Sequence, residues 1–413
     1  MARWVPKTWQ ANPDAPGGRA ARRAFRYQAF VPDPIAELDL ALPSAVVLAV
    51  FEAERAVQAL NSDPPKLASL EALARRLLRA ESVASSRIEG LQISQRRLAR
   101  AEAEEADARD LTARSVLGNI AAMEQAIRLA DQKRNLRVSD LLSIHRTLIE
   151  ATNEPRGAGE VREAQNWIGG NPFNPHGADF VPPPPEELPV LLKDLCAFLA
   201  REDLPPVVQA AIAHAQFETI HPFGDGNGRV GRALVHVVLR RRGLAPNYVP
   251  PVSLVLAADA RAYVAGLTAF REGHATAWCA FFAVAVRTAA TKASALSQRL
   301  GALQAQWRAR AGEPRRDSSA AALIDLLPAH PVLTVTVAAG LLSRSKQAAN
   351  EALAALVEAG VVQSLTLARR NRAFEAPELL ALVNAFEEEL TLPEGESGPR
   401  RPAPRSTNPV RRK

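Results

Sequence analysis

The chain has 413 residues, 47% hydrophobic, 23% charged and 5% aromatic, which is enough apolar material for two or three cored domains and excludes disorder throughout. The net charge of +7 lies at the two ends, because residues 28–390 hold 39 Lys and Arg against 41 Asp and Glu. The body of the chain is therefore not a nucleic-acid binder by bulk charge, and the basic ends are expected to be solvated tails.

The cysteine content and the hydropathy indicate the compartment. Only Cys196 and Cys279 occur, both within apolar helical patterns, which excludes a disulfide framework and a cysteine-based zinc site. No run of about 18 uncharged apolar residues is present, and the opening MARWVPKTWQ lacks the apolar core of a secretion signal. We expect a cytoplasmic protein that does not bind a membrane.

The first half of the chain, after an extended basic segment over 1–42, has an all-α pattern. From Pro43 onward apolar residues recur at helical spacing, with Arg and Glu between them. The spacing predicts helices over 44–59, 67–89, 94–107, 115–131 and 139–150.

The periodicity fails between Ala151 and Pro189, where Gly, Pro and Asn interrupt almost every turn. A loop of this length inside a compact domain is usually functional or a linker. Helical spacing returns, and it predicts helices over 188–200, 206–219, 229–242, 260–272 and 277–310. The connector AGEPRRDSS at 311–319 then predicts a domain boundary.

The region from 318 to 390 has the pattern of a winged helix-turn-helix. A helix over 320–327 and an apolar step over 333–337 come first. Two short helices joined by a Gly or Ser turn follow, the second over 345–359, and then an apolar strand pair around a basic turn. Basic residues lie on the predicted recognition helix and wing, where DNA contact or protein contact would place them. These residues are Arg344, Lys346, Arg369, Arg370 and Arg372. The Pro-rich basic tail 391–413 is expected to be disordered.

The segment HPFGDGNGRVGR, after one predicted helix, has the features of a phosphate site. Gly224, Gly226 and Gly228 permit close approach of the backbone, and a helix that begins near them directs N–H groups at an anion. Arg229 and Arg232, three residues apart, leave the first turn near the same face and add forked donors for phosphate oxygens.

Three other residues of this segment supply chemistry. Asp225 is a hard oxygen ligand suited to Mg²⁺, Asn227 is a neutral orienting group, and His221 lies where it could take a proton from an incoming hydroxyl. A base, a metal ligand and an anion site together predict transfer of a phosphorus-centred group from a nucleotide.

The segment matches the HPFx[D/E]GNGRxxR signature of the Fic family at every position, and the chain resembles that family. The resemblance implies an all-α Fic core over 113–310, preceded by a helical region over 43–112, that transfers AMP from ATP to a Ser, Thr or Tyr hydroxyl of a target protein. It implies His221 as general base, Asp225 as Mg²⁺ ligand, Phe223 as a buried anchor, Arg232 at the γ-phosphate, and Gly224, Gly226, Asn227, Gly228, Arg229 and Tyr263 as further nucleotide contacts. Tyr263 has a core or hinge role as its alternative.

The irregular stretch GEVREAQNWIGG, followed by FVPPPPEELP, resembles the family's flap, a short β-hairpin that aligns a target peptide by strand-like pairing. His176 and Asp179 lie in this flap and either meet substrate or are solvated.

The motif SSRIEG at 85–90 resembles the family's inhibitory helix, with Ser85, Glu89 and Gly90 in register. In that class the glutamate pairs with the second motif arginine, here Arg232, and so keeps ATP out of a productive position. The alternative is a plain helix end capped by Gly90.

The remaining histidines give weaker signals. His214 is expected to be a core or supporting residue, and His145, His236 and His274 show no metal-ligand spacing. A second hypothesis for the whole chain is a DNA-binding regulator with a nucleotide-sensing Fic domain. Transfer of another nucleotide, removal of AMP and a homo-oligomer also stay open.

Overall fold

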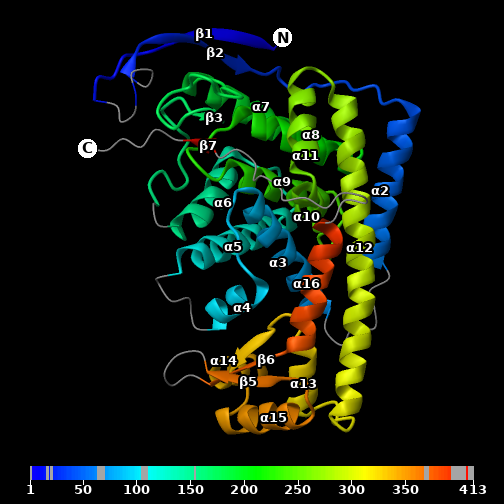
Figure 1. Ribbon diagram of the computed structural model, residues 1–413. Helices are drawn as coiled ribbons and strands as arrows, with labels where there is room; N and C mark the ends of the chain where they lie inside the picture. The colour runs from blue at the N-terminus through cyan, green and yellow to red at the C-terminus, as the bar shows by residue number, and fades with distance from the viewer. Residues whose placement is uncertain are drawn as a thin grey trace.

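The structure is a computed structural model, and it describes residues 2–14, 18, 22–62, 70–103, 110–152, 155–366, 372–391 and 406–407. Helices make up most of it, as the sequence predicted, with small sheets at the two ends (Figure 1). The helices of the larger body are α2 (Ser44–Ser62), α3 (Leu70–Ile88), α4 (Gln95–Ala103), α5 (Leu111–Asp131), α6 (Val138–Glu150), α7 (Leu188–Leu199), α8 (Pro206–Ile220), α9 (Asn227–Arg241), α10 (Val252–Ala258), α11 (Ala260–Arg271) and α12 (Ala275–Arg310), with a 3₁₀ turn η1 (Pro185–Glu187) before α7.

The core is built around α8 and α9, which the HPFGDGNGRVGR segment joins. Every residue of α8 after Pro206 is buried, and α9 is buried from Asn227 to Leu239. A helix that is apolar or small on all sides is stable only when other helices enclose it. Here α5, α7 and α12 pack around the pair, so the loop between α8 and α9 is held by the best-packed part of the molecule.

The longest helix, α12, links this body to the C-terminal unit (Figure 1). It packs along α2 and reaches down to α13, and it ends at Arg310, where the sequence predicted a boundary. Among the described residues, α12 is apolar and long enough to cross a membrane, and the bent pair α10 and α11 passes the same test together. Half of the apolar window of α12 is buried against other helices, which is the environment of a core helix.

The C-terminal unit contains α13 (Ser319–Leu326), β4 (Val332–Thr334), α14 (Val335–Leu342), α15 (Lys346–Glu358), β5 (Gln363–Thr366), β6 (Arg372–Glu375) and α16 (Pro377–Thr391). Its sheet is antiparallel in the order β4-β6-β5, with Leu333 opposite Phe374. Of the basic residues predicted here, Arg344 donates to the carbonyl of Asp317 and Arg372 lies over the ring of Phe374, whereas Arg369 and Arg370 lie outside the described residues.

The sequence analysis did not predict α10 and α16. The winged-helix pattern that it identified ends with the strand pair at Glu375, before α16 begins. One hydrophobic cluster contains Leu77 of α3, Trp307 of α12 and Phe386 of α16. The C-terminal unit therefore shares a hydrophobic core with the larger body, so the two are joined by packing as well as by the connecting chain.

The N-terminal segment, predicted as extended, is a hairpin of β1 (Arg3–Trp9) and β2 (Phe25–Val31). Trp9 packs edge-on against Trp167 of β3 (Trp167–Ile168), the strand of the predicted flap. On its other side, β3 pairs with β7 (Ser406–Thr407), so the prediction of a wholly disordered tail is wrong for these two residues, and α16 extends to Thr391. The other tail residues from 392 on lie outside the described residues.

Candidate active site

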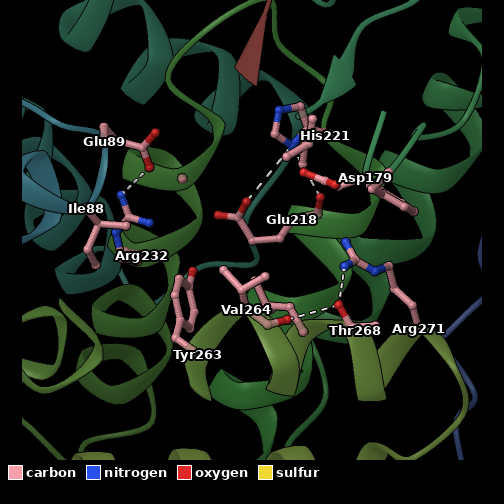
Figure 2. A pocket seen from close by; sticks show the side chains of 14 residues that line it. Ile88, Glu89, Asp179, Glu218, His221, Arg232, Tyr263, Val264, Thr268 and Arg271 are labelled. Carbon is pink, nitrogen blue, oxygen red and sulfur yellow. Dashed lines mark hydrogen bonds and ion pairs between the residues drawn. The ribbon is translucent and has the colours of Figure 1, made fainter. Parts of the chain in front are cut away.

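The loop between α8 and α9 begins with a residue in an unusual conformation. His221 ends α8 in the left-handed region, with φ 47° and ψ 59°, and its N–H donates to the carbonyl of Phe217 at 2.9 Å. A side chain with a Cβ is uncommon there and costs about 1 kcal/mol or more. The surrounding structure enforces this geometry, which turns the chain sharply and directs the imidazole toward the cavity in Figure 2.

The side chain of Asn227 closes the loop. Its Oδ1 accepts from the N–H of Phe223 at 2.8 Å, and its Nδ2 donates to the carbonyl of Phe223 at 2.8 Å. Asn166 of the flap segment donates to the same carbonyl at 3.0 Å, and the Phe223 ring is fully buried. Phe223 therefore lies buried beneath the loop, where an anchor is expected. Asn227 braces the loop with both ends of its amide, and each end keeps one further hydrogen-bonding position.

Two further residues hold the loop, and the sequence analysis assigned a role to neither. His145 of α6 stacks on Phe223 at 3.7 Å between ring centroids, accepts from the N–H of Gly159 through Nδ1, and so donates through Nε2 to the carbonyl of Asp225 at 3.0 Å. Arg162 donates to the carbonyls of His221 and Pro183. The contact of His145 with Asp225 joins residues 80 positions apart and that of Arg162 with His221 joins residues 59 positions apart, separations for which local spacing gives no signal.

The electrostatics keep His221 neutral. Burial, helped by the nearby charge of Arg162, lowers its pKa to about 3. Its Nδ1 lies 3.3 Å from the carbonyl of Glu218, and its buried Nε2 has no hydrogen-bond partner among the described residues. With Nδ1–H donating to Glu218, Nε2 carries the free lone pair that a general base requires.

Glu218 is the functional candidate that the sequence analysis missed, although it lies only three residues before His221. Its Oε2 is 4.0 Å from Nδ1 of His221, and burial raises the pKa of this carboxyl to about 7 against the attraction of Arg232. Figure 2 shows it between His221 and the arginines. A buried acid beside a predicted base was the signal that could have identified it.

The segment SSRIEG at 85–90 contacts the second arginine of the HPFGDGNGRVGR segment. Glu89 Oε1 lies 2.7 Å from Nη2 of Arg232 (Figure 2). Ser85 accepts from Arg232 through both its hydroxyl and its carbonyl at 2.9 Å. Burial works to lower the pKa of Arg232, but Glu89, Tyr263 and Glu218 outweigh it and the pKa is raised. Gly90 ends α3 with φ 82°, the conformation that a capping glycine adopts.

A cavity of about 190 Å³ lies between the flap, α8, α9 and α11 (Figure 2). His221, Glu218 and Arg232 line it together with Glu89. A Cβ added to Gly228 would lie 2.0 Å from Glu89 Oε1, so a side chain at position 228 would displace this carboxylate. The remaining lining residues are Ile88, Ile168, Asp179, Phe180, Tyr263, Val264, Leu267, Thr268 and Arg271.

The two motif arginines, predicted to share a face, separate in the structure. Arg232 faces the cavity, whereas Arg229 turns to Ser115 of α5 at 3.2 Å and to Asp225 at 3.1 Å. The position of the Arg229 guanidinium is therefore set by its contact with α5 and not by the three-residue spacing to Arg232. The Asp225 side chain is 66% exposed at the rim of the loop, and Gly226 adopts φ 81° where a Cβ would meet Leu148.

The other predicted residues divide between core and surface. Tyr263 lines the cavity and also belongs to the core, with its hydroxyl 2.8 Å from Nε2 of His214, which confirms His214 as a supporting residue. His236 is buried 2.9 Å from Glu81, and His274 and His176 are exposed. Among the described residues no group of three or more His, Cys, Asp or Glu side chains could hold a metal ion.

The comparisons with known proteins agree with this geometry. Residues 135–239 match the Fic/DOC family model, and residues 47–128 match the model of the Fic/DOC family N-terminal region. Over 138 residues the chain is 36% identical to a protein adenylyltransferase Fic of Drosophila willistoni and 35% identical to that of Drosophila virilis. The match takes in 33% of this chain and 26% of each of those relatives.

A Fic family protein from Desulfovibrio desulfuricans has a similar fold, with a TM-score of 0.50 and 21% identity over 82% of this chain and 97% of that structure. The two family models match in order along the sequence, so residues 47–128 and 135–239 are similar to the Fic/DOC family, and the solved structure shows a shared fold around them.

Proposed function

We propose that the protein is an auto-inhibited adenylyltransferase that transfers AMP from ATP to a Ser, Thr or Tyr hydroxyl of a target protein. The relatives named protein adenylyltransferase support the reaction, although the match spans about a quarter of their length. One observation carries the proposal: Glu89 forms an ion pair with Arg232 in the cavity that also holds His221.

His221 acts as the general base of this reaction. The target hydroxyl attacks the α-phosphorus, the bond to pyrophosphate breaks, and the hydroxyl proton passes to Nε2 of His221. Burial keeps the imidazole neutral until then. The carboxyl of Glu218 lies beside Nδ1 and, once ionised, stabilises the imidazolium that forms.

The nucleotide phosphates bind at the first turn of α9. The N–H groups of this turn have no partner within the helix, and the helix dipole adds partial positive charge. Gly228 opens the space beside them, and Arg232 supplies a guanidinium inside the cavity. These features fit the triphosphate of ATP.

Asp225 fits a Mg²⁺ ligand. Its carboxylate is exposed at the loop rim, and one carboxylate together with substrate phosphate oxygens and water is the usual coordination of this ion. Bound there, Mg²⁺ would neutralise phosphate charge during transfer.

Inhibition follows from competition for one guanidinium. The Glu89 carboxylate and a γ-phosphate cannot both occupy Nη2 of Arg232, because both are anions that accept from the same donors. While Glu89 is in place, ATP is held away from the geometry that aligns its α-phosphorus with His221.

The C-terminal unit is a winged helix in this proposal. The order α13, β4, α14, α15, β5 and β6 with a three-stranded antiparallel sheet supports it. Contact with DNA, a homo-oligomer, removal of AMP and transfer of another nucleotide are the alternatives that experiment decides, and a cytoplasmic location is part of the proposal.

The deciding experiment incubates wild type and Glu89→Gly with Mg²⁺ and α-labelled ATP, and follows label on the protein itself and on a cell lysate. Glu89→Gly frees Arg232, so incorporation should rise about 5- to 150-fold, the range of typical coupling energies. Glu37→Gly, at an exposed carboxylate, is the control and should match wild type. Label on neither variant, with ATP bound, would favour the nucleotide-sensing regulator.

A further inference from the structure

The C-terminal unit contacts the segment that carries Glu89. Glu387 of α16 lies 3.0 Å from Nη2 of Arg87, two residues before Glu89, and also accepts from Nε2 of Gln95, the first residue of α4. Figure 1 shows α16 rising from the C-terminal unit beside α12 and α3. The two contacts therefore bracket the turn between α3 and α4, which we term the elbow, residues 89–94.

A second pair of contacts holds α4 itself. Glu375 of β6 accepts from Arg96 at 2.6 Å and from Arg100 at 3.4 Å. Ala99 and Ala103 of the same helix form a small apolar cluster with Val332 and Ala373 of the sheet. Thus α4 lies on the C-terminal sheet, and the elbow joins this helix to α3.

Both acids are buried, with 9% of the Glu387 side chain and 2% of the Glu375 side chain exposed. A buried carboxylate that loses its cation is left uncompensated in a low-dielectric interior, which is strongly unfavourable. The contacts are therefore selective for one position of the elbow relative to α16. A surface ion pair would not have this selectivity.

The rest of α3 is attached to different elements. Glu81 accepts from the N–H of Ser253 at 2.7 Å and lies 2.9 Å from His236, and Asn119 of α5 donates to the carbonyl of Ser82 and to the hydroxyl of Ser86. These contacts fix α3 up to Ser86 on α5, α9 and α10. The body of α3 also shares an apolar cluster with α16, whereas the ion pair and the hydrogen bond from Glu387 go to the last turn of α3 and to the first residue of α4.

The interface with α16 also contains an unfavourable element. Arg76 of α3 is 1% exposed, donates to Gln95 at 3.2 Å, and has no partner for Nε or Nη1 among the described residues. Unpaired buried donors cost stability. This cost lowers the free energy needed to separate α16 from the elbow, as a reversible contact requires.

We propose that the C-terminal unit is a latch: through Glu387 and Glu375 it holds the elbow where Glu89 occupies Arg232, and displacement of α16 releases Glu89 and starts transfer. The inference rests on the proposed function, because it assigns the regulation of the same site. The signal acts on the C-terminal unit and reaches the active site through Arg87 and Gln95, without contact with ATP.

The test measures AMP incorporation by full-length variants. Glu387→Arg places two cations together and should raise incorporation roughly 10-fold over wild type, in the range of a typical coupling. Arg87→Glu combined with Glu387→Arg restores an opposite pair and should return incorporation toward wild type. The matched control is Glu389→Gln, which removes a 2.7 Å pair with Arg299 of α12 on the same helix and should change nothing.

Glu89→Gly, assayed in parallel, separates the two ideas. If it raises incorporation and the Glu387 variants do not, the latch is wrong and inhibition by Glu89 stands. If Glu89→Gly itself has no effect, the inhibition fails and the latch fails with it.

Should Glu387→Arg not fold, Glu387→Gln keeps the side-chain shape and weakens the same pair. Hydrogen exchange then gives a second measurement, because the N–H of Leu91 bonds to the carbonyl of Ser86 across the elbow. Faster exchange at Leu91 with unchanged exchange in α8 supports the latch. Unchanged exchange at both places overturns it.

Discussion

The loop that begins at His221 and the segment that ends at Glu89 meet at Arg232, but they are held in different ways. Asn227, His145 and Arg162 fix the loop from three sides, and each of these contacts is buried. Glu89 reaches Arg232 from a helix end, with 29% of its side chain exposed. Many buried contacts hold the loop, whereas the proposed inhibitory carboxylate lies at a helix end that fewer contacts hold.

The difference indicates how one cavity serves both chemistry and control. Orientation of a base must be kept within a fraction of an ångström, so many contacts hold it. An inhibitory group must leave when a signal arrives, so few contacts hold it and a separate unit supplies some of them. The variants below perturb the side that many contacts hold, at His221, Asn227 and Glu218.

The largest effect is expected from the base. His221→Ala in the Glu89→Gly background should lower AMP incorporation by roughly 10²- to 10⁴-fold, the usual contribution of general-base catalysis, while ATP binding persists. Filter binding and label transfer measure the two quantities. His274→Ala, at an exposed histidine, is the control, and undiminished transfer by the His221 variant would remove this residue as base.

A smaller effect is expected from the loop brace. Asn227→Ala leaves the buried N–H of Phe223 without its partner, which should cost about 2 kcal/mol of unfolding free energy and lower Tm by a few degrees. Transfer should fall because His221 is less well oriented. Asn247→Ala, at an exposed asparagine, should leave Tm unchanged, and equal Tm values for the two variants would show that the brace adds no stability.

The smallest effect is a dependence on pH. Ionisation of Glu218 near its pKa of about 7 places a negative charge beside His221, so transfer by Glu89→Gly should rise a few-fold through that pH. Groups that face Glu218 from neighbouring elements are Arg232, Glu89 and Arg271. Glu218→Gln should flatten the profile, and a profile that keeps its shape in this variant argues against the role.

The same pKa predicts how stability changes with pH. The folded protein keeps the Glu218 proton that the unfolded chain loses near 4.5, so the stability from this group falls as pH rises from about 4.5 to about 7. Thermal unfolding of wild type and Glu218→Gln measures this slope. Glu54→Gln, another acid whose pKa burial raises, serves as a control that should leave the transfer profile unchanged.

Most of the helical fold followed from the sequence because amphipathic spacing is local. The helices predicted over 277–310 and 139–150 agree with α12 and α6, which end at Arg310 and Glu150. The short α10 and the hairpin β1–β2 did not follow, since both are stabilised by contacts with distant segments. Likewise the shared face predicted for Arg229 and Arg232 was wrong, because Ser115 of α5 and Asp225 hold the Arg229 guanidinium away from the cavity that Arg232 lines.

The sequence alone determined which groups the site contains: a histidine, an acid, glycines and two arginines in a fixed frame, with a second acid upstream at Glu89. Only the tertiary structure decided what each group does. It placed Glu89 on Arg232, Glu218 beside His221 and Glu387 on Arg87, contacts that join residues as far as 300 positions apart. The pairs of Glu89 with Arg232 and of Glu387 with Arg87 depend on the packing of whole helices, and spacing along one helix carries no information about them.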